Sequence, residues 1–264
     1  MIPFFMSIPH SGEKVPPEAT WLKGLPEKIL MCDVDRYVDQ IYQDCIQELE
    51  IPVVTTDWHR YVVDLNRFPE DIDKGTVDDS KNEAGKFSRG FHWAITTKKE
   101  VLMPRPISRQ SHDDFVKKYY EPFHKNILNQ VTVLRKKGFK DFYHIDAHSM
   151  PSLGTSEHKD PGEQRADFVI SDVKGTSCSP EFKDLVMAAY SQSGFKVAYN
   201  WPYVGGRITE MYGNPKSGHH TIQVEMNRKL YMDEETKKII PSKALEMRKK
   251  LVPILSRIKN GLPK

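Results

Sequence analysis

Short apolar runs bounded by turn-forming residues recur along the chain and predict β-strands. They are rich in β-branched and aromatic side chains, which favour strands over helices at these lengths. Strands are expected at residues 2–8, 51–55 and 61–65, within 142–152, and at 166–171, 196–201 and 219–226.

Apolar side chains at helical spacing predict four helices between and after these strands. The first follows Asp35, and the others lie at 112–137, 181–193 and 243–259, with kinks expected at Pro122 and Pro253. The apolar face of the first helix would carry Val38, Ile41, Tyr42, Cys45 and Leu49. Because strands and helices alternate over nearly the whole length, we predict a single domain, residues 1–264, of layered α/β/α type around a central sheet.

One long stretch, residues 68–111, lacks clear periodicity. It is charged, interrupted by glycine and proline, and contains a short aromatic island, Phe91, His92 and Trp93. Segments of this length without periodicity are typical of lids, binding loops or small hairpins. We therefore predict a lid or insertion segment here.

Composition excludes several classes of protein. The 264 residues are 38% hydrophobic and 28% charged with a net charge of +3, and no apolar run approaches a membrane span. Mixed charges without a basic stripe argue against a nucleic-acid partner. The apolar opening lacks the basic start and cleavage site of a signal peptide and is interpreted as a strand. Three cysteines without metal-site spacing leave a cytoplasmic protein as the expectation.

Polar residues at the ends of predicted strands supply candidate metal ligands. His10 follows the first strand, and Asp146 and His148 lie where the apolar run beginning at residue 142 turns polar. Imidazole nitrogens at such positions suit zinc, and a nearby carboxylate can fix the tautomer. Asp33 or Asp35 could be a carboxylate ligand, or could instead cap the helix that follows.

Other polar residues suit substrate binding and proton transfer. Asn66 and Arg67, at the end of the 61–65 run, match bidentate capture of a substrate carboxylate, although a surface ion pair is the simpler alternative. Glu225 lies among apolar residues, where burial raises the pKa of a carboxyl group towards the range of a general base. Its alternative role is an ion pair with Arg228. Two histidines, a carboxylate and a separate glutamate form the inventory of a catalytic zinc site.

Six blocks in the same order resemble the N-formylglutamate amidohydrolase family. They read SIPHSG, DVDRYVD, RYVVDLNR, DAHSMPS, NWPYVGGRITEMYG and IQVEMNRKLYMDE, and they span almost the full chain. That family is distantly related to zinc carboxypeptidases and aspartoacylases. The resemblance implies a phosphorylase/hydrolase-like three-layer α/β/α sandwich with a mixed central sheet.

The resemblance also implies roles for individual residues. It implies Zn²⁺, or another divalent metal, on His10, Asp35 and His148, with Asp146 behind His148. Glu225 becomes the general base and then the general acid. Arg67 and Asn66 would bind the substrate α-carboxylate. The remaining substrate contacts would be Arg60 or Arg207 for a second carboxylate, and Tyr203 and Tyr212 as hydrogen-bond donors to the tetrahedral intermediate. Departures from the family pattern at 34–39 and 74–110 bear on the acyl group more than on the metal.

The resulting hypothesis is a zinc-dependent amidohydrolase acting on a small carboxylate substrate, N-formyl-L-glutamate, to give formate and L-glutamate. One alternative keeps hydrolysis but changes the substrate to a γ-glutamyl, peptidoglycan-derived or other acyl-amino-acid bond. A second alternative is a non-catalytic module that binds acidic amino acids, against which the full set of candidate catalytic groups argues. The pattern gives no indication of oligomeric state.

Overall fold

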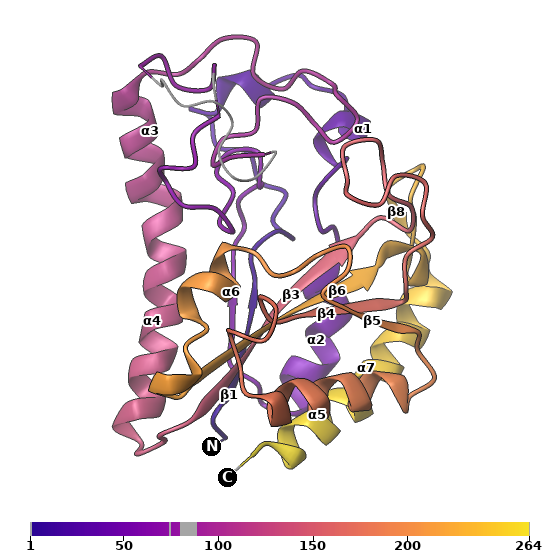
Figure 1. Ribbon diagram of the computed structural model, residues 1–264. Helices are drawn as coiled ribbons and strands as arrows, with labels where there is room; N and C mark the ends of the chain where they lie inside the picture. The colour runs from indigo at the N-terminus through magenta and orange to yellow at the C-terminus, as the bar shows by residue number, and fades with distance from the viewer. Residues whose placement is uncertain (1, 74, 80–88, 264) are drawn as a thin grey trace.

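The computed structural model describes residues 2–73, 75–79 and 89–263, and its centre is a six-stranded sheet with the order β2-β1-β3-β6-β4-β5 (Figure 1). Strands β2, β1, β3 and β6 are parallel, whereas β4 pairs antiparallel with β6 and parallel with β5. The sheet is therefore mixed, as expected. Its strands are β1 Phe4–Ile8, β2 Val53–Thr55, β3 Phe142–Met150, β4 Phe168–Ser171, β5 Val197–Tyr199 and β6 His219–Asn227.

Helices cover both faces of this sheet, which confirms the three-layer architecture (Figure 1). Helices α2, α5 and α7 pack on one face, and α4 and α6 pack on the other. A small hairpin, β7 Met232–Asp233 and β8 Lys238–Ile239, follows β6. The helices are α1 Glu27–Leu30, α2 Val38–Glu48, α3 Arg109–Phe115, α4 Glu121–Lys136, α5 Pro180–Ser191, α6 Arg207–Tyr212 and α7 Pro241–Gly261. No helix among the described residues is long and apolar enough to cross a membrane.

The two faces of β3 differ in chemistry, and this difference decides where a site can form. Side chains alternate between the faces of a strand. Tyr143, Ile145 and Ala147 enter the apolar cluster beneath α2, α5 and α7. His144, Asp146 and His148 therefore share the opposite face, which α4 and α6 cover. One face holds the sheet in the core, and the other presents polar groups.

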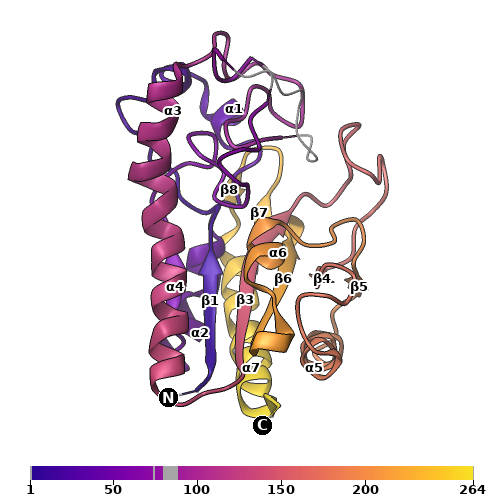
Figure 2. The same ribbon diagram turned by 60° about the vertical axis from the view of Figure 1, so that its left-hand side comes forward.

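The predicted helices are present, with one local difference. The 112–137 helix consists of α3 and α4 joined by a π-helical turn, Val116–Tyr120, and forms one continuous column (Figure 2). The turn ends two residues before Pro122, which has no N–H to donate to the carbonyl four residues earlier. The irregularity predicted at Pro122 thus lies one turn earlier. Pro253 lies inside α7, which continues through it.

The strand predicted at 61–65 is wrong. These residues form turns in which Val62 N–H donates to His59 O at 2.9 Å and Asp64 N–H donates to Phe91 O at 2.8 Å. Their apolar side chains are buried, which explains the strand-like pattern, but they pack in the core on the α4 side without joining the sheet. Burial without a neighbouring strand edge produced the same short apolar run as a real strand.

The described part of 68–111 contains no helix or strand before α3 begins at Arg109. Residue 74 and residues 80–88 of the predicted lid lie outside the described residues. Phe91, His92 and Trp93 are buried, so the aromatic island is part of the core on the α4 side of the sheet. A lid or insertion within a single domain stays a prediction.

Candidate metal centre and active site

Three buried side chains meet where β1 and β3 end. His10 follows β1, Asp35 lies between α1 and α2, and His148 lies near the end of β3. Their ligand atoms all lie within 4.8 Å of one another, and the group could hold a metal ion. Asp35 Oδ2 lies 3.6 Å from His10 Nδ1 and 3.0 Å from His148 Nδ1. His10 Nδ1 is buried and has no hydrogen-bond partner among the described residues, which fits a nitrogen that faces a metal.

Both imidazole rings are held from behind by carboxylates. His10 Nε2 lies 2.7 Å from Asp64 Oδ1, and His148 Nε2 lies 2.8 Å from Asp146 Oδ2. When Nε2 donates its proton to a carboxylate, Nδ1 carries a lone pair and faces the other ligands. Asp146 thus lies behind the His148 ring, whereas Asp64 was missed because it falls in the segment interpreted as a strand.

The structure separates the two aspartates that the sequence left open. Asp33 accepts hydrogen bonds from Tyr61 Oη at 2.6 Å and from the backbone and hydroxyl of Thr97, so its carboxylate serves local structure. Asp35 belongs to the cluster with the histidines. Neither side chain caps the following helix, whose N-cap is Tyr37 in a left-handed conformation.

The charge of Asp35 is balanced on both sides. Burial alone would raise the pKa of Asp35, but the neighbouring His10 and His148 rings and the positive charge of Arg60 hold that pKa well below its usual value. Its Oδ1 atom accepts a hydrogen bond from Arg228 Nη2 at 2.9 Å. Arg228 thus leaves Oδ2 facing the histidines, and it pairs with Asp35 instead of with Glu225 as the alternative had it.

Glu225 lies beside the metal-ligand cluster by strand register. Its Cα pairs with that of His148 across the parallel β3 and β6 strands, so both side chains project from the same face. Gln223 Nε2 donates to Glu225 Oε1 at 2.8 Å. Burial raises the pKa of Glu225, and the negative charge of Asp35 adds to this shift while His148 and Arg228 oppose it. A buried carboxyl with a raised pKa is suited to accept and return a proton.

Asn66 and Arg67 lie next to this group. Asn66 Nδ2 lies 3.5 Å from His148 Nε2, and Asn66 Oδ1 accepts from Ile208 N–H at the start of α6 at 2.8 Å. Arg67 donates to the carbonyl oxygens of Arg89 at 2.6 Å and Asn66 at 2.7 Å, and it has further interactions. Burial lowers the pKa of Arg67. Binding of a substrate carboxylate by this pair stays a prediction.

The two other predicted arginines already contact carboxylates of the chain. Arg60 Nη2 donates to Asp64 Oδ2 at 2.9 Å, so Arg60 contacts the residue that holds His10. Arg207 forms a bidentate pair with Asp71, at 3.0 Å and 2.9 Å. Their predicted contacts with a second substrate carboxylate remain untested.

The predicted tyrosines occupy different surroundings. Tyr203 Oη lies 3.0 Å from Arg165 Nη1; burial raises the pKa of Tyr203, and the negative charge of Glu225 adds to this shift. Tyr212 Oη lies 2.8 Å from His124 Nδ1, and the Tyr212 ring contacts the rings of both His124 and His219. Sequence reasoning missed Arg165, which falls in a polar loop with no pattern to single it out.

Two connections touch each other near the site. Glu157 pairs with Arg89 at 3.3 Å and with Lys99 at 3.0 Å. Thr155 Oγ1 donates to Thr97 O at 3.4 Å. Residues 153–165 and the described part of 89–103 are therefore joined by ion pairs and a hydrogen bond.

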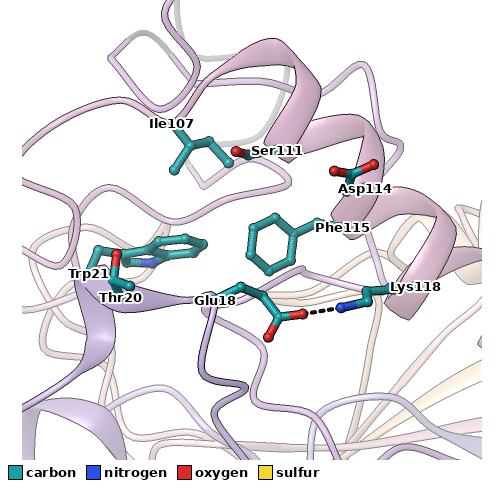
Figure 3. A pocket seen from close by; sticks show the side chains of 8 residues that line it. All are labelled: Glu18, Thr20, Trp21, Ile107, Ser111, Asp114, Phe115 and Lys118. Atoms are coloured by element: carbon teal, nitrogen blue, oxygen red, sulfur yellow. Dashed lines mark hydrogen bonds and ion pairs between the residues drawn. The ribbon is translucent and has the colours of Figure 1, made fainter.

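A separate cavity of about 260 Å³ lies between α3 and the segment after β1, with Trp21 facing Phe115 and an ion pair of Glu18 with Lys118 at its side (Figure 3). None of the predicted site residues lines it. The cavity therefore does not mark the His10, Asp35 and His148 cluster.

The fold is a three-layer sandwich whose mixed sheet carries a buried His/Asp/His cluster beside a buried glutamate. This combination defines a hydrolase with a metal-binding site. The model of the N-formylglutamate amidohydrolase family matches residues 2–232, and the chain belongs to this family.

Relatives and solved structures agree with this assignment. N-formylglutamate deformylase of Pseudomonas putida is 26% identical over 238 residues, 88% of this chain and 83% of the relative. The same enzyme of Pseudomonas aeruginosa is 28% identical over 237 residues, 89% and 84% of the two chains. The crystal structure of N-formylglutamate amidohydrolase from Ralstonia eutropha has a TM-score of 0.84 at 24% identity, covering 99% of this chain and 95% of that one. A protein from Agrobacterium tumefaciens has a TM-score of 0.69 at 15% identity, covering 97% and 91%. The two structures establish the shared fold.

Proposed function

We propose that this chain hydrolyses the N-acyl amide bond of an acidic amino acid, and that its substrate is N-formyl-L-glutamate. The observation that carries the proposal is the buried cluster of His10, Asp35 and His148 with Glu225 beside it in strand register. The two Pseudomonas relatives are named for this deformylation, and the family match supports the same reaction here. The cytoplasmic location expected from the sequence stays a prediction.

Zinc is the metal we propose for the cluster. Two imidazole nitrogens and one carboxylate oxygen form a donor set that catalytic zinc uses, although manganese, iron, cobalt and nickel also accept it. His10 Nδ1, which has no hydrogen-bond partner in the described part of the chain, and the carboxylates behind both rings fit this role. When bound, the ion would polarise the amide carbonyl and make a water molecule nucleophilic at neutral pH.

Glu225 is the proposed proton carrier. Water adds to the formyl carbon, and the proton that it loses passes to the Glu225 carboxylate. The same proton then passes to the nitrogen of the departing glutamate as the C–N bond breaks, which gives formate and L-glutamate. The raised pKa of Glu225 suits a group that both takes and returns a proton.

Arg67, with Asn66 beside it, is the proposed partner of the substrate α-carboxylate. The buried guanidinium has a lowered pKa, so a bound carboxylate would stabilise its charged form. Arg60 and Arg207 are alternatives for the second carboxylate. Each already contacts a carboxylate, Asp64 and Asp71 respectively, so the substrate would share that arginine with the protein.

The test is hydrolysis of N-formyl-L-glutamate by zinc-loaded protein, with a chelator-treated sample and N-acetyl-L-glutamate as comparisons. We expect turnover that the chelator abolishes, that zinc restores, and that is faster with the formyl substrate. Zinc binding without hydrolysis of the formyl substrate would contradict the substrate assignment. Hydrolysis that survives complete removal of metal would contradict the role of the cluster.

A further inference from the structure

The two predicted tyrosine donors differ in where their hydroxyl protons can go. His124 Nε2 lies 3.0 Å from Leu65 O, a carbonyl that can only accept, so this nitrogen carries the proton. Burial lowers the pKa of His124 to about 4, so the ring is neutral and its Nδ1 can only accept. Tyr212, 2.8 Å from Nδ1, must therefore donate its proton to His124. The Tyr212 hydroxyl proton is therefore used in a hydrogen bond within the protein.

Tyr203 is in the opposite situation. Arg165 Nη1 lies 3.0 Å from Tyr203 Oη, and a guanidinium can donate hydrogen bonds but cannot accept them. The Tyr203 oxygen therefore accepts, and its own proton points elsewhere. Within residues 2–73, 75–79 and 89–263, no hydrogen bond donated by the Tyr203 hydroxyl is present.

Arg165 is held firmly enough to impose this direction. Its Nε and Nη2 atoms donate to the two oxygens of Asp160 at 2.7 Å and 2.8 Å, and both side chains are 1% exposed. Its Nη1 also donates to Pro151 O at 3.2 Å. The Tyr203 backbone is fixed as well, because Ser171 Oγ donates to Tyr203 O at 2.8 Å.

The direction of β4 brings Arg165, and with it Tyr203, to the end of β6 that carries Glu225. Since β4 runs against β6, the start of β4 lies beside the end of β6, with Phe168 paired to Met226 and Val169 to Glu225. Arg165 precedes β4 by three residues. Burial raises the pKa of Tyr203, and the negative charge of Glu225 adds to this shift; the same charge also helps to raise the pKa of Arg165.

We propose that Arg165 is a positioning residue that turns the Tyr203 hydroxyl proton towards the reacting amide, where Tyr203 stabilises the oxygen that becomes negative when water adds. The proposal rests on the proposed function and deepens it. It assigns the donor role to Tyr203 and not to Tyr212. Arg165 itself does not touch the substrate, because its guanidinium is occupied by Asp160, Pro151 and Tyr203.

A double-mutant cycle tests this arrangement. Removing one donor to such an oxygen costs about 10²–10³-fold in kcat, so we expect Y203F to lower kcat by that factor with little change in KM. R165M should lower kcat by a similar factor in the wild-type background and by less than threefold in Y203F. Y212F should lower kcat less than Y203F does.

A second readout does not depend on turnover. With 3-fluorotyrosine at position 203, the ¹⁹F resonance should shift in R165M and stay in place in R257M, a control that removes an exposed arginine bonded to Gln192. Zinc content and thermal melting of each variant establish that it is folded and loaded.

The outcomes separate the two proposals. A wild-type protein that fails to hydrolyse N-formyl-L-glutamate overturns the proposed function, while the ¹⁹F comparison still decides whether Arg165 acts on Tyr203. A wild-type protein with turnover, but with additive effects of R165M and Y203F or an unchanged ¹⁹F resonance in R165M, overturns the role of Arg165.

Discussion

Replacing Asp146 with asparagine tests whether the carboxylate behind His148 makes that ring a stronger metal ligand. Asp146 is fully buried, and its Oδ2 accepts the Nε2 proton of His148 at 2.8 Å while Nδ1 faces Asp35. Asparagine keeps an oxygen that can accept the same proton, so the ring orientation is retained. It removes the negative charge that raises the basicity of Nδ1.

The expected magnitude follows from this geometry. Loss of such a carboxylate lowers metal affinity about 10–100-fold, which corresponds to roughly 1.4–2.7 kcal/mol. The upper part of this range is expected because Asp146 Oδ1 also accepts a proton from Ser7 Oγ at 2.5 Å. An amide placed with its nitrogen towards Ser7 would leave the hydroxyl proton without that acceptor.

The assay is competition for zinc with a chromophoric chelator, performed on wild type, D146N and D141N. Asp141 lies just before the same strand, is half exposed and contacts His220 at 3.2 Å, so D141N makes the same chemical change away from the cluster. We expect D141N to bind zinc like the wild type. Thermal melts of the metal-free proteins show whether each variant is folded. Wild-type zinc affinity in folded D146N would refute the claim that Asp146 strengthens His148 as a ligand.

Three further outcomes are expected. E225Q should retain zinc and lose about 10²–10⁴-fold in kcat because the amide cannot carry the proton; near-normal kcat would contradict this role. The pKa of His124 is about 4 in the fold against an ordinary 6.5, because burial favours the neutral ring. The neutral ring therefore contributes about 3 kcal/mol to the free energy of unfolding above pH 6.5, and this contribution is lost as the pH falls towards 4. Urea unfolding of metal-free protein between pH 7.5 and 4.5 should therefore show a smaller loss in H124Q than in wild type, and equal losses would disprove it. S7A should lower the free energy of unfolding by about 1–3 kcal/mol, because Nε2 of the buried His144 loses its hydroxyl partner at 2.7 Å. An unchanged denaturation midpoint would argue against that bond.

The sequence was sufficient for most of the sheet because β1, β3, β4 and β6 are buried along their whole length. The run that forms β6 and the apolar start of β3 needed no tertiary information to be recognised. The same reasoning failed at 61–65, where burial comes from contacts with Phe91 and the α4 side of the core instead of from a sheet. Periodicity reports burial, and it does not report which backbone groups are paired.

The site shows a similar division. His10, Asp35 and His148 were predicted from residue type, position and the family resemblance, and the fold brings them together. Apart from Asp146, which the resemblance implied behind His148, the residues that hold them could not be predicted, because their roles depend on contacts between distant parts of the chain. Asp64 lies 54 positions from His10, and Arg228 lies 193 positions from Asp35. No local pattern encodes such a contact.

The reversed direction of β4 has a practical consequence for redesign of this enzyme. Two parallel strands require a crossover that carries the chain back from the C-terminal end of one strand to the opposite end of the sheet. In contrast, β3 and β4 run in opposite directions. The connection 151–167 therefore starts and finishes at the same end of the strands. The register of the sheet does not depend on the length of this connection. An exchange limited to residues 153–159 would keep Asp160 and Arg165 in place while replacing the stretch that contacts 89–103. Residues 153–159 can thus be exchanged while His148 on β3 and Glu225 on β6 keep their places in the sheet.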